Sequence, residues 1–126
     1  MTKGIRALCV FTVVLWAAMP NAMAHDASIK SMAGIIMHLN HYPSDSDKKT
    51  LAAIASDDHV SSGERTLAGA LMRMQHSVEG QDAAALRALT ADKHASQDER
   101  ELATILLGIH HHPSASDQKQ LKSLSE

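Results

Sequence analysis

The chain has 126 residues, room for one domain, and its 12 lysines and arginines against 14 acids give a net charge of −2. A mildly acidic chain lacks the basic surface that nucleic acids require, so we expect no nucleic-acid partner. The single cysteine, Cys9, excludes a disulfide within the chain.

Residues 1–24 are typical of a secretory signal peptide. Lys3 and Arg6 precede a short apolar run, and Ala-Met-Ala at the end of the segment predicts cleavage after Ala24. The run is too short to span a membrane, which takes about 20 apolar residues. We therefore expect a periplasmic or secreted protein whose mature chain, from His25, has a charge of −4 and no membrane span.

The mature sequence repeats one pattern with a period of 35 residues. The register holds without gaps through units of about 26–60, 61–95 and 96–126. Aligned positions carry matching residue types: Ala33, Ala68 and Ala103; Ile36, Leu71 and Leu106; Leu51, Leu86 and Leu121; His41, His76 and His111. A period of this size indicates helical hairpins in tandem. We predict one all-α domain over 25–126, with three hairpins and six helices stacked as a short solenoid or a compact bundle.

Each unit begins with a long helix whose apolar residues recur at helical spacing. Ser61 with Glu64, and Ser96 with Glu99, form the pattern of a capping box, in which the side chains of the cap and of the third helical residue bind each other's backbone. In the first unit isoleucine replaces the glutamate, so Asp26 is expected to cap alone.

A short helix follows in each unit. In the first and third units a proline ends the long helix, and the next residue, Ser44 or Ser114, is expected to cap the short one. Asp47 and Asp117 fall in the first turn, where negative charge suits the helix dipole. The middle unit has Gly80 for this turn.

The period and the two-helix layout resemble the class of short αα-hairpin tandem repeats, such as tetratricopeptide and HEAT-type arrays. The tetratricopeptide Trp, Gly-Tyr and closing Pro positions have no counterpart here, so the resemblance names a class of architecture and no family. It implies a groove that takes a peptide or a partner helix.

Catalytic motifs are missing from the sequence. It contains no G-x-S-x-G, no phosphate-binding glycine loop and no H-E-x-x-H, and the mature chain has no cysteine nucleophile. We therefore expect no enzymatic activity.

Histidine is the unusual residue, with nine copies, all in the mature chain. The aligned His41, His76 and His111 follow the long helices, where an imidazole can bind the last free carbonyls. Under this interpretation their repetition needs no ligand.

The alternative is a transition metal, since imidazole is a common ligand for zinc, copper and nickel. His38 and His41 have chelating i, i+3 spacing on a helix, and three histidines are consecutive before Pro113. After cleavage, the amine and imidazole of His25 resemble part of the histidine brace of secreted copper proteins. The candidate ligands are His25, His38, His41, His76, His110, His111 and His112.

We therefore predict an exported, non-enzymatic helical-repeat protein that acts as a binding or interaction module for a protein or peptide, with weak metal binding by histidine as an added hypothesis. The alternative is a dedicated periplasmic binder of copper, nickel or zinc. Native mass spectrometry with each metal separates the two, because an ion that binds only the native state stabilises it.

Overall fold

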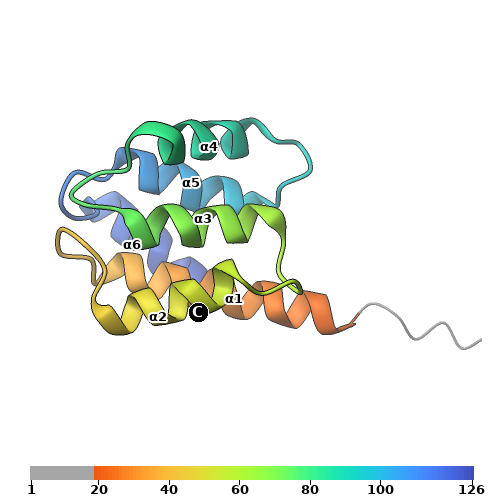
Figure 1. Ribbon diagram of the computed structural model, residues 1–126. Coiled ribbons are helices and arrows are strands. Elements are labelled where there is room, and N and C mark those ends of the chain that lie inside the picture. The colour runs from red at the N-terminus through yellow and green to blue at the C-terminus, as the bar shows by residue number, and fades with distance from the viewer. Residues whose placement is uncertain (1–18) are drawn as a thin grey trace, which may run out of the picture.

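The computed structural model describes residues 19–126, and this part of the chain is all-helical with no β-strand (Figure 1). The prediction of an all-α fold with six helices is thereby confirmed. The helices are α1 (Met19–Met37), α2 (Asp45–Ala55), α3 (Ser62–Arg73), α4 (Gly80–Ala91), α5 (Gln97–Gly108) and α6 (Ala115–Ser125).

Helix starts follow the expected capping chemistry in four of the six helices. The Ser61 and Ser96 side chains accept from the backbone N–H of Glu64 and Glu99, whose carboxylates accept from the cap N–H in return. The predicted caps of α2 and α6 also form complete capping boxes, with aspartate in place of glutamate. The turn before α4 has Gly80 at a φ of +60°, a conformation that glycine adopts at no steric cost.

The start of α1 differs from the prediction. Residues 19–24 belong to this helix, so Asp26 lies inside it rather than at its cap. Its carboxylate instead forms an ion pair with Lys30 one turn later, at 3.1 Å. Most of the predicted signal peptide lies outside the described residues.

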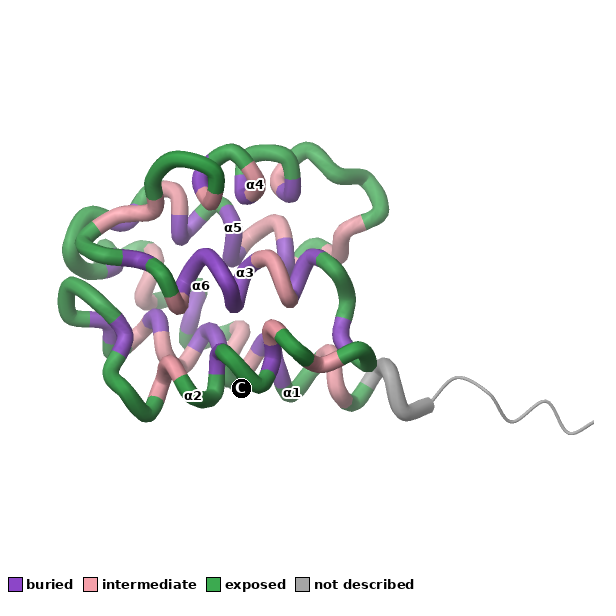
Figure 2. The backbone as a smooth tube through the Cα atoms, in the orientation of Figure 1, coloured by how far each residue is buried: buried purple, intermediate pink, exposed green. Residues whose placement is uncertain are grey.

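The core consists of aliphatic side chains that recur at aligned positions. Figure 2 marks the buried residues along the helices. Nine side chains at three sets of aligned positions are at most 1% exposed: Ala33, Ala68, Ala103, Ile36, Leu71, Leu106, Leu51, Leu86 and Leu121. Burial of apolar surface at about 25 cal/mol per Å² is the main stabilising contribution available to such a core.

The helices pack most extensively across the unit boundaries, α2 on α3, α4 on α5, and α6 on α1. The first helices of the three units, α1, α3 and α5, also contact one another in pairs. The first and last helices therefore lie side by side. The expected contrast between a long and a short helix is weak, because α3, α4 and α5 each have 12 residues. The loops α1–α2, α3–α4 and α5–α6 lie at one end of the helices, on the left of Figure 1, and the α2–α3 and α4–α5 links lie at the other. No helix in the described range is long and apolar enough to cross a membrane.

Candidate metal centre

The three loops at one end of the helices share an uncommon backbone conformation. His41, His76 and His111 have φ values of +69°, +64° and +75°, a region that residues other than glycine seldom occupy. The N–H of Tyr42 donates to the carbonyl of Asn40 at 2.9 Å, and the middle loop makes the equivalent bond at 2.6 Å. A hydrogen bond between residues two apart, around a central residue of positive φ, is a rare and strained γ-turn.

Main-chain hydrogen bonds join the three histidines in a closed ring. The N–H of His76 donates to the carbonyl of His41 at 2.8 Å, that of His111 to His76 at 2.8 Å, and that of His41 to His111 at 2.9 Å. Each strained residue costs about 1–3 kcal/mol and persists only where its surroundings impose the conformation. The ring supplies this constraint and also satisfies backbone groups that have left the helices.

The imidazole rings meet at the centre of this arrangement. The Nδ1 atoms of His41, His76 and His111 lie 3.1, 3.1 and 3.2 Å apart, so they form a nearly equilateral triangle. Neighbouring rings meet edge to face, with centroids 5.0–5.1 Å apart. A neutral imidazole has one donor and one acceptor nitrogen, so among three converging Nδ1 atoms at least one pair must bring two lone pairs or two N–H groups together. With the protons on Nε2, all three lone pairs face one another. A cation between them removes this repulsion.

The triangle has the size that a metal ion requires. Zinc binds imidazole nitrogen at about 2.0–2.1 Å, so His41, His76 and His111 could each supply one Nδ1 to a single ion. All three residues are exposed, so the remaining coordination positions face solvent. Such an arrangement can hold one ion and leave room for an exchangeable ligand.

The electrostatics favour the neutral form that ligates metals. Loss of hydration beside its neighbours and repulsion from His41, His76, His112 and His110 lower the pKa of His111 below its ordinary value of 6.5. A depressed pKa keeps the ring unprotonated at mildly acidic pH, so an ion competes with fewer protons there.

The structure thus brings together three of the seven predicted ligands. The rings of His41, His76 and His111 contact one another, not the carbonyls at the ends of α1, α3 and α5, so the capping interpretation is wrong for them. The prediction that His38 and His41 form a chelating pair on one helix is also wrong. His38 follows the end of α1 and its ring contacts the carbonyl of Gly34 at 2.9 Å, while His41 lies in the loop.

The remaining predicted ligands lie elsewhere. His110 and His112 flank His111 as the two partners of an isolated bridge, and the ring of His112 contacts the Pro113 carbonyl at 3.3 Å. His25 lies in α1, near the far end of the helices.

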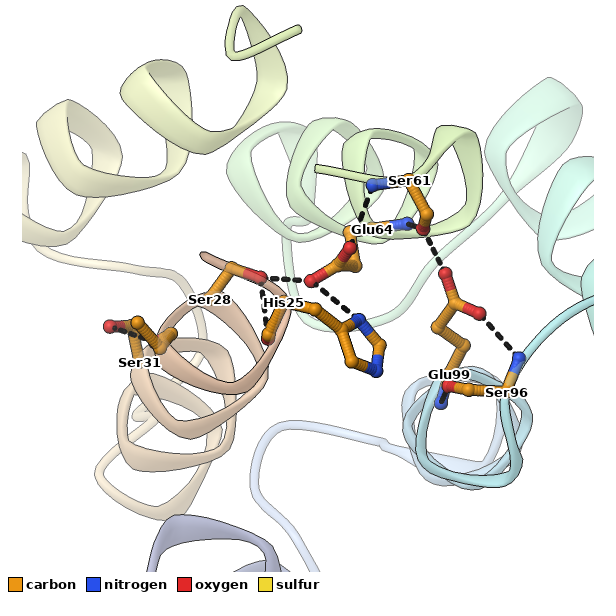
Figure 3. Close-up of polar contacts among 8 residues, drawn as sticks. His25, Ser28, Ser31, Ser61, Glu64, Ser96 and Glu99 are labelled. Atoms are coloured by element: carbon orange, nitrogen blue, oxygen red, sulfur yellow. Dashed lines mark hydrogen bonds and ion pairs between the residues drawn. The ribbon is translucent and has the colours of Figure 1, made fainter. Parts of the chain in front are cut away.

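Sequence reasoning missed two residues beside His25. Glu64 and Glu99 are buried and converge with it on one point (Figure 3). The 35-residue spacing that relates the histidines also relates these glutamates, and this signal could have identified them.

Comparison with known proteins gives no precedent for either cluster. No family model, curated protein or solved structure matches the chain. The chemistry of the three imidazoles therefore carries the functional argument.

Proposed function

We propose that this protein binds a divalent transition-metal ion reversibly through His41, His76 and His111. The single observation that carries the proposal is the triangle of Nδ1 atoms 3.1–3.2 Å apart. Three imidazole nitrogens suit zinc, copper and nickel. The sequence suggests a dedicated binder of copper, nickel or zinc as the alternative function, and these three histidines are the site that we propose for it.

The backbone geometry supports a ligand-binding role for the three histidines. A positive φ costs free energy at three aligned positions, and strained residues of this kind cluster at functional sites. Asparagine, like histidine, is enriched among non-glycine residues of positive φ, and glycine adopts a positive φ at least cost. The backbone conformation alone therefore gives no reason for histidine in all three loops.

Exposure and the hydrogen bonding of the outer ring nitrogens favour reversible binding over catalysis. Metal-ligating histidines usually donate their second ring N–H to a carboxylate or carbonyl, which fixes the ring and strengthens binding. Among the described residues, no such bond from Nε2 of the triad is present. An exposed site without this support exchanges its ion readily, as storage or delivery requires, and we propose no enzymatic activity.

The N-terminal sequence supports a location outside the cytoplasm, because residues 1–24 have the pattern of a signal peptide. We place the metal site in the periplasm or in the secreted protein. The repeat layout also predicts that the protein acts as an interaction module for a protein or peptide partner, and this stays a prediction.

Isothermal titration with zinc, copper(II) and nickel tests the proposal. We expect the purified protein to show a binding step that His76→Asn removes, because asparagine also occurs at positive φ but provides no imidazole. The affinity of this step should fall at least about 100-fold, beyond the 10–100-fold effect of changing a group that only hydrogen-bonds to a metal ligand. His38→Ala, which removes an exposed histidine outside the triad, is the matched control and should leave the step unchanged. A titration without this step, or equal binding by His76→Asn, contradicts the proposal.

A further inference from the structure

Two buried carboxylates lie close together at the end of the helices opposite the triad. Glu64 is 0% exposed and Glu99 is 3% exposed. Each uses one oxygen, Oε2, to accept from the backbone N–H of its helix cap, at 2.7 Å from Ser61 and 2.6 Å from Ser96. Capping therefore uses one oxygen of each carboxylate, and the other oxygen, Oε1, is free to contact other groups.

The second oxygens turn toward His25 and two serine hydroxyls (Figure 3). Oε1 of Glu64 lies 3.1 Å from Nδ1 of His25 and accepts a hydrogen bond from Ser28. Oε1 of Glu99 accepts a hydrogen bond from Ser61. His25, Glu64 and Glu99 each offer one ligand atom within 4.8 Å of the others. The convergence crosses three helices, since these residues come from α1, α3 and α5.

The two carboxylates differ in their ion-pair partners. Burial lowers the pKa of His25, but the hydrogen bond to Glu64 and the nearby carboxylates outweigh burial and raise this pKa above 6.5. Glu64 is paired with His25, whereas Glu99 has no ion-pair partner among the described residues. Buried charges in proteins are normally paired or coordinate metals. A charged Glu99 therefore needs a partner that these residues do not supply.

The surroundings leave room for an ion and a route to it. A Cβ atom at Gly63 would lie 2.5 Å from Oε1 of Glu99, so only glycine allows the carboxylate this position. The cluster opens on a cavity of about 470 Å³, which His59 and His94 also line. These two exposed histidines are aligned in the repeat and bring two more imidazoles to the same opening.

We infer that His25, Glu64 and Glu99 form a second metal site, separate from the triad, for a divalent ion of the zinc type. One imidazole nitrogen and two carboxylate oxygens are ligands that zinc accepts. Calcium and magnesium take oxygen ligands, so the imidazole argues against them. The ion would give Glu99 the partner that the described residues do not supply.

Titration of zinc chloride into His76→Asn protein isolates this site, because the variant lacks a complete triad. We expect about one equivalent of zinc to bind. Glu99→Gln in the same background keeps the hydrogen-bonding shape but removes a charge and a ligand, so affinity should fall at least about 10-fold. Gly63→Ala should also weaken binding at least about 10-fold, because its Cβ displaces the Glu99 carboxylate. Glu101→Gln, the same change elsewhere in α5, is the control and should bind as before.

Circular dichroism establishes that each variant is folded. If Glu99→Gln does not fold, His25→Ala replaces it, because this side chain is one-third exposed and its loss leaves the core intact. The inference is overturned if His76→Asn protein binds no zinc, or if folded Glu99→Gln or His25→Ala binds as tightly as its parent. The first of these outcomes leaves the triad proposal standing, since it places all zinc binding at the histidines.

Discussion

The two ends of the helices show how one repeated backbone can place different chemistry at aligned positions. At the loop end all three units present histidine, and the three rings meet symmetrically. At the opposite end, where α3 and α5 begin with their capping boxes (the capping end), the aligned residues are Ile29, Glu64 and Glu99. An apolar side chain therefore stands in place of one of three carboxylates. The fold brings aligned side chains together, and the residue types decide whether the result is symmetric.

Burial separates the ends further. The histidines are exposed, so an ion there exchanges with solvent at little cost to the fold. The glutamates are buried, so their charges affect stability whether or not an ion is present. Changes at the capping end should therefore act mainly on folding, and changes at the loop end mainly on metal affinity.

The largest effect is expected where the broken symmetry is restored. Ile29→Glu places a third carboxylate at the position aligned with Glu64 and Glu99, at a site only 2% exposed. An unpaired buried charge costs about 3–5 kcal/mol, and the free energy of unfolding in metal-free buffer should fall by that amount. Urea denaturation at pH 7 measures it.

Ile29→Leu is the control for this change, because it conserves volume and polarity and should cost less than about 1.5 kcal/mol. Equal losses for the two variants would mean that packing, rather than charge, distinguishes Ile29 from the aligned glutamates.

A smaller effect of opposite sign is expected at the loop end. His76→Gly relieves a positive-φ conformation that costs about 1–3 kcal/mol, while the greater freedom of glycine in the unfolded chain lowers stability by about 0.5–1 kcal/mol. Metal-free stability should therefore rise by up to about 2.5 kcal/mol, while the metal-binding step disappears. Thermal unfolding in a chelator measures the first effect and titration the second.

The neighbouring Gln75→Gly serves as the matched control, because Gln75 is exposed and has no positive φ. Glycine there should lower stability by about 0.5–1 kcal/mol. If His76→Gly also lowers metal-free stability, the imidazole has a structural role and the contrast between the ends weakens.

The smallest effect is a difference in pH dependence. Because the pKa of His111 is lower in the folded protein, the unfolded chain binds a proton more readily than the folded one. Stability is therefore lost as pH falls from the ordinary pKa of 6.5 through the lowered pKa. The raised pKa of His25 has the opposite sign, and its stabilisation is complete below 6.5 and lost as pH rises through the raised value. Urea denaturation in metal-free buffer measures the free energy of unfolding at each pH. His111→Asn should reduce the loss of stability on the acidic side of the profile, and His25→Ala should reduce the loss on the alkaline side. An unchanged profile in either variant would contradict the assigned sign.

Local features of this fold could be predicted from the sequence because local chemistry determines them. Ser61 and Glu64 bind each other's backbone across a single turn, and their spacing alone reveals the cap. The buried leucines follow from helical spacing in the same way. Asp26 shows the limit of this reasoning, because the helix around it begins earlier and a cap pattern cannot exclude that.

The two clusters could not be derived because both depend on contacts between units. The sequence aligns His41 with His76 and His111, but it does not show α6 returning to α1, which brings residues 70 apart within 3.1 Å. Nor does it reveal the positive φ that turns each ring inward, since histidine also occurs widely in ordinary conformations. The spacing of Glu64 and Glu99 predicts a capping role for each. That role uses one carboxylate oxygen and gives no indication of where the second oxygen points.

The ring of main-chain bonds has neither a first nor a last member. Each histidine donates to one neighbouring loop and accepts from the other, so displacing any one loop breaks two of the three bonds. The displacement of one loop therefore weakens the hold on the other two. An ion held by all three rings would link the first and last thirds of the chain at these loops, in addition to the packing of α1 on α6.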